Sequence, residues 1–270
     1  MVGIDDFLAV PSDCIIDKVI AKEKFYSYGS LKSKDKQFFQ DYVGQIRWHA
    51  RFAEDNTHIL PYNDETKRYN EVEIIRVVLK DENLKELTDR DKVNNAYFVQ
   101  DKRIERVIEI IFRFITFPQL IVLQYRNRVK LCVTHLTINQ ADSSKFTLDE
   151  IISTNWINLN NLNDLEKSLM ENIQLKNLSH DNFYKFYSDI VDSIIHYNGS
   201  VLAGKKVELS VDRIKCITDR IKELEKEIKM LQRELKNETQ HPLRSKLNNE
   251  IRNRRIEIRD LKEELEQVVC

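Results

Sequence analysis

The stretch LKNETQHPLRSKLN, residues 235–248, interrupts a run of regularly spaced isoleucines and leucines near the end of the chain. One series of apolar residues, in alternating steps of three and four, runs from Ile214 to Leu235, the first residue of this stretch. A second series with the same steps begins out of phase at Leu247, near the end of the stretch, and runs to Val268. Such spacing is typical of a coiled-coil seam. We therefore expect this stretch to be the tip of an antiparallel helical hairpin.

A single continuous helix with a phase stutter is the alternative explanation for the break. It is disfavoured because Pro242 inside a helix would remove a hydrogen bond and crowd the preceding turn, at about 3 kcal/mol. Arg254 occupies a seam position of the second arm. A helix edge, or a carboxylate from a docked partner, would satisfy it there. We expect the projecting hairpin to bind a partner protein through its basic residues, which are Arg244, Lys246, Arg252, Arg254 and Arg259.

The composition describes a helix-rich chain with a sizeable core. Of 270 residues, 41% are apolar and 32% charged, with only 5 Gly and 4 Pro. Because 43 Lys and Arg oppose 44 Asp and Glu, the overall field would not steer the chain onto nucleic acid or an anionic membrane. Any such binding must therefore use a local patch.

The cysteines and the N-terminus point to a reducing compartment. The four cysteines lie far apart and form no CxxC pair, so neither a zinc site nor a disulfide framework is indicated. Acidic residues stand where a signal peptide would be basic, and no apolar run reaches the length of a membrane span. We expect a cytoplasmic protein without a metal, a cofactor or membrane contact.

The first 160 residues predict a mixed α+β core domain. KSKDKQFFQDYVGQIRWHARF, residues 32–52, has apolar residues three or four apart and predicts an amphipathic helix. EVEIIRVVLK, residues 71–80, predicts a strand buried on both faces. Residues 101–118 predict a second helix that Pro118 ends, and residues 119–138 predict two antiparallel strands around the tip RNR. Residues 146–159 add another strand. The expected fold is a mixed sheet with flanking helices.

Two further segments follow this core. Residues 161–205 are a helical segment, with one helix expected to begin at a Ser179 cap and to stop at Gly199. Residues 206–270 form the antiparallel coiled-coil hairpin.

A cluster of lysines and aromatic residues lies near the N-terminus. AKEKFYSYGSLKSKDK contains Lys22, Lys24, Tyr26, Lys32 and Lys34. Lysines neutralise phosphates and exposed aromatic rings stack on bases, so these residues are a candidate nucleic-acid contact. The alternative is a lysine-rich loop whose aromatic residues anchor it in the core.

No constellation of catalytic residues stands out. Glu71 and Glu73 lie on one strand, as the carboxylates of a metal-dependent nuclease do, but the lysine expected two residues after Glu73 is replaced by Ile75. The carboxylates are then the solvated start of a strand. His49 would stand near the end of the first helix, where a polar side chain is common. The sequence therefore favours a protein that is not an enzyme, without assigned catalytic or metal-binding residues.

Several motifs together resemble a bacterial and archaeal family that is named only as a domain of unknown function. They are VIAKEKFY (19–26), IRW (46–48), VEIIRVVL (72–79), TNWINL (154–159) and NETQHPLRSKLNNEIRNRRIEIRDLKEELE (237–266). Members of that family end in a helical hairpin and are typically encoded beside superfamily-2 helicases and site-specific DNA methyltransferases, in clusters that look like restriction or phage-defence islands. No catalytic residues are transferred by the resemblance.

The resemblance and the hairpin together imply an accessory or adaptor subunit of a helicase-containing, DNA-acting antiphage complex. The hairpin would dock on a helicase or ATPase, and on a methyltransferase where one is present. Any DNA contact would be indirect, and the coiled coil also allows self-association. Two alternatives remain open: a small metal-dependent nuclease or effector of such a system, and a stand-alone nucleic-acid-binding module.

Overall fold

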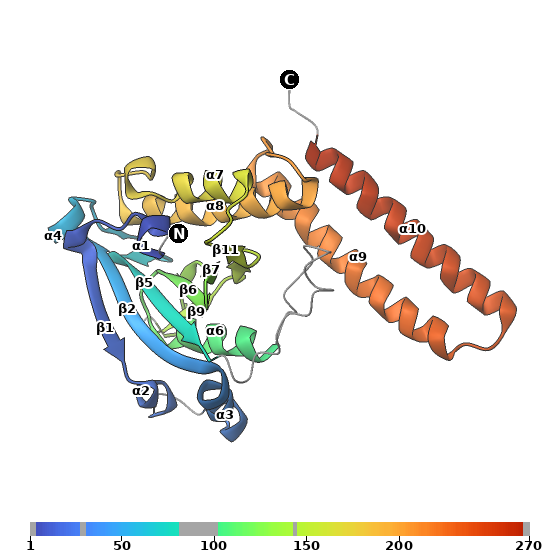
Figure 1. The fold of residues 1–270 in the computed structure, drawn as a ribbon, viewed down its shortest axis with the longest axis horizontal. Coiled ribbons are helices and arrows are strands. Elements are labelled where there is room, and N and C mark those ends of the chain that lie inside the picture. The colour runs from blue at the N-terminus through green and yellow to red at the C-terminus, as the bar shows by residue number, and fades with distance from the viewer. Residues whose placement is uncertain (1–3, 28–30, 81–101, 143–144, 267–270) are drawn as a thin grey trace. The chain divides into compact units, whose positions relative to one another are not determined.

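The computed structural model describes residues 4–27, 31–80, 102–142 and 145–266. The chain divides into two compact units, residues 1–194 and 195–270. The first is an α+β unit built around one mixed sheet, and the second is helical (Figure 1). The expected fold class is confirmed. None of the described helices is both long and apolar enough to cross a membrane.

The main sheet has the strand order β1-β2-β5-β6-β7-β10, with β11 also paired to β7. The strands are β1 (Ile15–Ile20), β2 (Val43–Ala53), β5 (Glu71–Leu79), β6 (Gln119–Tyr125), β7 (Arg128–Val133), β10 (Ile152–Ser153) and β11 (Ile157–Asn158). Only β5 and β6 pair in parallel; the other neighbours are antiparallel. Helix α6 (Lys102–Phe114) lies between these two strands in the sequence, as a parallel pair requires.

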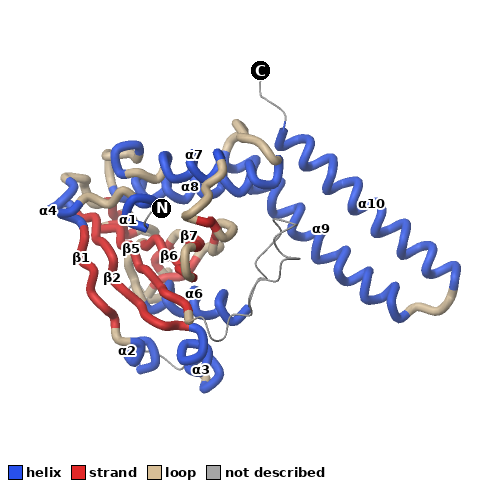
Figure 2. Tube along the Cα trace, viewed as in Figure 1, coloured by secondary structure: helices blue, strands red, loops and turns tan. Residues whose placement is uncertain are grey.

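Helices lie on both sides of this sheet, as Figure 2 shows. On one side, α6 packs its buried face with α3 (Ser33–Tyr42) against Ile75 and Val77 of β5 and Ile121 of β6. On the other side, Phe186 of α8 (Phe183–Ala203) packs on Phe52 of β2, with ring centroids 5.4 Å apart. Because β5 is covered on both faces, its apolar run is nearly continuous, as expected.

The remaining elements of the first unit are short. They are α1 (Ile4–Leu8), α2 (Lys22–Ser27), α4 (Glu54–Thr57), α7 (Asp164–Asn172), two 3-10 turns (Ser12–Cys14 and Leu175–Asn177), and the paired strands β3 (Tyr62–Asn63) with β4 (Arg68–Tyr69) and β8 (Leu136–Ile138) with β9 (Phe146–Leu148).

The predicted helix over residues 32–52 is wrong beyond Tyr42. Residues 43–53 form β2, which lies between β1 and β5. The register of β2 against β5 shifts between Val43 and Gln45 and again between Trp48 and Ala50. Each such irregularity breaks the strict alternation of a strand. Apolar residues in β2 therefore recur at spacings that resemble those of a helix.

Three other predictions differ from the structure. The single strand expected over residues 146–159 is divided into β9, β10 and β11. The second strand of the 119–138 hairpin ends at Val133, and residues 136–138 form β8 in a separate sheet with β9. The helix expected over 179–199 is α8, which begins at Phe183 and runs past Gly199 to Ala203. Gly199 lies inside this helix, where Ile214 of α9 comes so close that a Cβ on residue 199 would lie 2.7 Å from its Cγ2. Gly204, with φ +74°, instead follows the helix end.

The C-terminal helices form the expected antiparallel hairpin. Helix α9 (Val211–Asn237) and helix α10 (His241–Glu266) lie side by side and are joined by residues 238–240 (Figure 1). Pro242 belongs to the first turn of α10 rather than to the connector. That position suits proline, since the first amides of a helix have no intrahelical acceptor.

Candidate functional site

A row of polar side chains crosses three neighbouring strands of the main sheet. Arg51 of β2 is the register partner of Glu73 on β5, and Glu73 is the register partner of Gln119 on β6. Residues paired in this way project to the same face of a sheet. Glu71 lies two residues before Glu73 and so shares that face. Its Oε2 accepts a 2.6 Å hydrogen bond from Nε of Arg51.

Glu73 is the unusual member of this row. It is only 6% exposed, and its carboxylate has no hydrogen-bond partner among the described residues. Burial first, and then the negative charge of Glu71, raise the pKa of Glu73 to about 7, with Arg51 opposing both effects. Gln119, 1% exposed, donates from Nε2 to the carbonyl of Ile115 at 3.0 Å, while its buried Oε1 has no partner.

Within this row, the carboxyl group of Glu73 can exchange a proton near neutral pH. A carboxyl with a pKa near 7 populates both protonation states there, as a general acid or base must. Its use as a metal site is less well supported, because the guanidinium of Arg51 already binds Glu71. Across the described part of the chain, no three His, Cys, Asp or Glu side chains are grouped so that they could hold a metal ion.

The sequence identified Glu71 and Glu73 but not the two neighbours that define their environment. The expectation that both carboxylates are solvated holds only in part, since Glu73 is buried. Arg51 was placed in a helix, and Gln119 appeared as the first residue of an apolar strand. Only the strand register brings Arg51 and Gln119 beside Glu73, and no local pattern encodes that register.

His49 lies in β2, not near the end of a helix as expected. It is 3% exposed, and its Nε2 lies 3.0 Å from Oδ1 of Asp5 in α1. Nδ1 of His49 has no hydrogen-bond partner in the described residues. Burial lowers the pKa of His49, although the nearby Asp5 carboxylate works against this. A buried ring whose Nε2 lies beside one exposed carboxylate indicates a structural role.

The lysine cluster divides between structural and exposed members. Nζ of Lys22 donates a 3.0 Å hydrogen bond to the carbonyl of Val43 and is partly buried. Lys24, Lys32 and Lys34 are exposed. The side chain of Tyr26 lies outside the described residues. The adjacent Phe25 is fully buried and stacks on Phe39, with centroids 5.6 Å apart, so it anchors α2 in the core.

Two of the five basic residues expected to bind a partner are used inside the hairpin. Nη1 of Arg244 donates to the carbonyls of Leu235 and Glu238, at 3.1 and 2.8 Å, and so caps the C-terminal end of α9. Nε of Arg254 donates to Oε2 of Glu227 at 2.6 Å. The carboxylate that Arg254 requires therefore comes from the opposite arm.

The other three remain at the surface and do not form one patch. Arg259 pairs with Asp260 and Glu263 on its own helix, whereas Lys246 and Arg252 are exposed without an ion pair in the described residues. Arg252 and Arg259 are seven residues apart and share one side of α10. Lys246 lies six residues before Arg252, which places it about 120° away around the helix.

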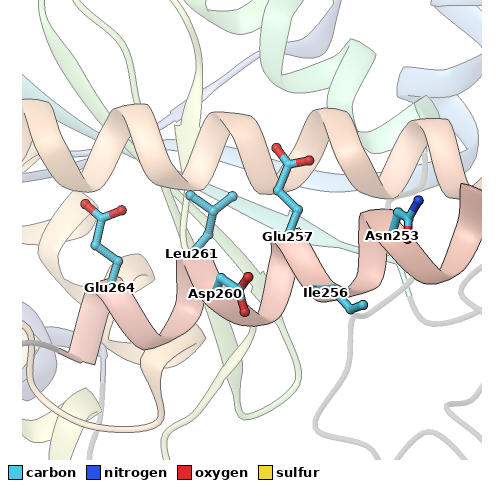
Figure 3. Close-up of a pocket in the computed structure, with 6 residues that line it drawn as sticks. All are labelled: Asn253, Ile256, Glu257, Asp260, Leu261 and Glu264. Carbon is cyan, nitrogen blue, oxygen red and sulfur yellow. The ribbon is translucent and has the colours of Figure 1, made fainter.

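One side of the hairpin is held by ion pairs between the arms. Arg213 pairs with Glu264, and Nε of Arg220 lies 2.8 Å from Oε1 of Glu257. A groove of about 360 Å³ runs along α10 on this side, lined by Asn253, Ile256, Glu257, Asp260, Leu261 and Glu264. In Figure 3, Glu257, Leu261 and Glu264 extend from α10 toward α9. The acidic lining of this groove is already paired with basic side chains of the opposite arm and of α10 itself.

Comparison with known proteins places the chain in a family but does not transfer an activity. Residues 8–258 match the family model described as "Domain of unknown function (DUF4391)". No curated protein and no solved structure matches the chain. The match begins within α1 and ends within α10, so it includes the main sheet and most of the hairpin. The chain therefore belongs to the DUF4391 family, a domain of unknown function.

Proposed function

We propose that this protein is a non-catalytic accessory or adaptor subunit of a helicase-containing, DNA-acting antiphage complex, and that it docks through the α9–α10 hairpin. The resemblance to proteins encoded beside helicases and DNA methyltransferases supports the kind of complex. One observation supports the docking role: the seam residues of α9 lose burial toward the tip, and Leu243 at the start of α10 is exposed.

The seam residues of α9 differ along the hairpin, whereas on α10 Ile251 is buried and Ile258 and Leu261, farther from the tip, are partly buried. In α9, Ile214, Ile217, Ile221, Leu224 and Ile228 are all buried, with exposures from 0 to 9%. Nearer the tip, Leu231, Leu235 and Leu247 are only partly buried, and Leu243 is 42% exposed. Helices of 27 and 26 residues are about 40 Å long. The tip therefore presents apolar side chains that a partner could cover, at about 25 cal/mol for each Å² removed from water.

Co-purification with the proteins of neighbouring genes tests this role. The full chain should elute with the helicase, whereas Leu235→Glu combined with Leu243→Glu should abolish co-elution while the helical content stays unchanged. Leu60→Glu is the matched control, because Leu60 is 57% exposed in the first unit. If the tip variant still joins the helicase, docking belongs to another surface and the proposal is wrong.

A small metal-dependent nuclease or effector is the second candidate; the buried Glu73 is the observation for it, and the pairing of Glu71 with Arg51 weighs against its metal site. A carboxyl with a pKa near 7 beside an unpartnered Gln119 Oε1 is the kind of perturbed site at which enzymes act. Incubation of the purified chain with plasmid DNA and Mg²⁺ or Mn²⁺ tests it. We expect no cleavage. Cleavage by the wild type that disappears in Glu73→Gln would replace the adaptor proposal.

A stand-alone nucleic-acid-binding module is the third candidate, with Lys24, Lys32 and Lys34 as its exposed cations. In that case the chain would bind DNA without a helicase, and reversal of these three charges would abolish binding. The same three substitutions are a control in the experiment of the next subsection.

A further inference from the structure

The distal half of the hairpin, residues 226–255, is strongly basic. It contains nine Lys and Arg against four Glu, a net charge of +5, in a chain whose net charge is −1. The connector is not the source of this charge, because Arg244 is occupied as a helix cap. The unpaired cations lie along the two helices instead.

The charges of this distal half are separated onto two sides. Arg213, Arg220 and Glu227 follow each other at intervals of seven along α9 and pair with α10, so they mark one side of the hairpin. Glu234 continues this series on α9, and Glu250 lies seven residues before Glu257 on α10. With Glu238 in the connector, where its Oε1 accepts from two amides, these positions account for all four acidic residues.

Six basic residues lie away from that side, at least about 100° around their helices from the ion-pair positions. They are Lys226, Lys229, Arg233 and Lys236 on α9, and Arg252 and Arg255 on α10. We name them the basic flank. All six side chains are exposed, and none of them makes a hydrogen bond or an ion pair with another described residue. In the proximal half, by contrast, Arg213, Arg220 and Arg259 are all paired.

The distance between neighbouring cations of the basic flank resembles the distance between neighbouring phosphates along one strand of DNA. Lys226, Lys229, Arg233 and Lys236 succeed one another by three or four residues, which places neighbours about 5–6 Å apart over about 15 Å of helix. Glu227 pairs with Arg254 across the hairpin. Arg252 and Arg255 therefore lie near the level of Lys229 and Lys226, and they broaden the row by one helix.

We propose that the basic flank is a sequence-independent binding surface for the phosphate backbone of duplex DNA. No Phe, Tyr or Trp occurs in residues 205–266 to stack on unpaired bases, so the surface suits a duplex better than a single strand. Exposed amides at Gln232 and Asn248 lie among the cations and can also donate to phosphate oxygens. A membrane is less suitable: Met230 and Ile256 are exposed beside these cations, but two separate side chains do not make the continuous apolar face with which an amphipathic helix lies on a bilayer.

This surface is independent of the apolar docking residues at the tip. Leu235 and Leu243 are not members of the basic flank, so partner association and DNA binding can be abolished separately. Failure of one proposal would leave the other intact.

Fluorescence anisotropy of the full chain with a short labelled duplex of random sequence, over a range of salt concentrations, tests the inference. The flank variant is Lys229→Glu with Arg233→Glu and Arg252→Glu. Its matched control is Lys24→Glu with Lys32→Glu and Lys34→Glu, which changes the net charge by the same amount. Circular dichroism confirms that each variant retains its helices, and the corresponding Gln substitutions replace any variant that does not fold.

We expect the flank variant to bind at least about a hundredfold more weakly near 0.1 M salt, because a slope of about 0.9 makes each of the three contacts worth roughly eightfold in affinity between 1 M and 0.1 M salt. The slope of log K against log salt should become shallower by about 0.9 for each lost contact. The control should bind as the wild type does.

The inference is overturned if the folded wild type does not bind the duplex, or if the flank variant binds as the wild type does. Loss of binding in the control alone would move the site to α2 and α3. Equal competition by polyglutamate at matched charge would mark a surface for acidic protein instead.

Discussion

Replacement of Glu73 by Gln should stabilise the first unit relative to the wild type increasingly as the pH rises. A glutamate has a pKa near 4.5 when exposed, and that of Glu73 is raised to about 7 in the folded protein, chiefly by burial. Between these two values the folded state binds more protons than the unfolded state. The free energy of unfolding therefore falls as the pH rises through this window.

The size of the effect follows from the shift. A difference of about 2.5 pKa units corresponds to about 3 kcal/mol, fully present above pH 7 and absent below about pH 4.5. Glutamine has nearly the same shape but does not titrate. The stability difference between Glu73→Gln and the wild type should thus grow by about 3 kcal/mol between these limits, whatever its constant part is.

Urea unfolding followed by tryptophan fluorescence measures this difference. Both tryptophans of the chain, Trp48 and Trp156, belong to the first unit and pack against the core beneath α6. The signal therefore reports the unit that contains Glu73. Glu65→Gln, an exposed carboxyl in the same unit, controls for the loss of one negative charge. A difference that stays constant from pH 4.5 to pH 8 would refute the assignment of a raised pKa to Glu73.

Three further substitutions test the helical unit. Gly199→Ala should destabilise the packing of α8 on α9 by about 1–3 kcal/mol, since the new Cβ would lie 2.7 Å from Ile214 Cγ2. Adding Ile214→Ala to the same chain should restore part of this loss, as measured by thermal unfolding. Ile228→Asp should unfold much of the hairpin, because it places a charge at a seam position that is only 9% exposed, and the helical circular dichroism signal should fall. Gln232→Asp, on the exposed surface of the same helix, should retain that signal. Arg254→Ala should cost no more than about 1 kcal/mol, because its ion pair with Glu227 is partly exposed; a larger loss in urea unfolding would mean that the pair organises the arms.

The exposed cations of the hairpin show how far periodicity extends. The seam steps of three and four already define which residues lie away from the seam, so heptad positions alone indicate that the cations of the basic flank are exposed. The sequence instead suggested Arg244 and Arg254, which the folded hairpin uses internally. Whether a cation is free depends on which carboxylate lies opposite, and this in turn depends on how the two arms align.

The elements that the sequence determined by itself are those whose signals are local. The heptads with Pro242 determine the hairpin, the apolar run of residues 72–79 determines β5, and the amphipathic pattern before Pro118 determines α6. Each depends only on neighbours within a few turns of helix or one strand, where side-chain period and backbone geometry are directly linked.

Tertiary structure decided the rest. Residues 43–53 have helix-like spacing and still form β2, because pairing with β1 and β5 on both sides outweighs the local preference and two register irregularities absorb the mismatch. The same pairing brings Arg51 and Gln119 beside Glu73, from positions 22 residues before it and 46 after it. Strand register is a long-range property, set by the burial of whole faces rather than by adjacent residues. The buried carboxyl therefore acquires its raised pKa only when the sheet has formed.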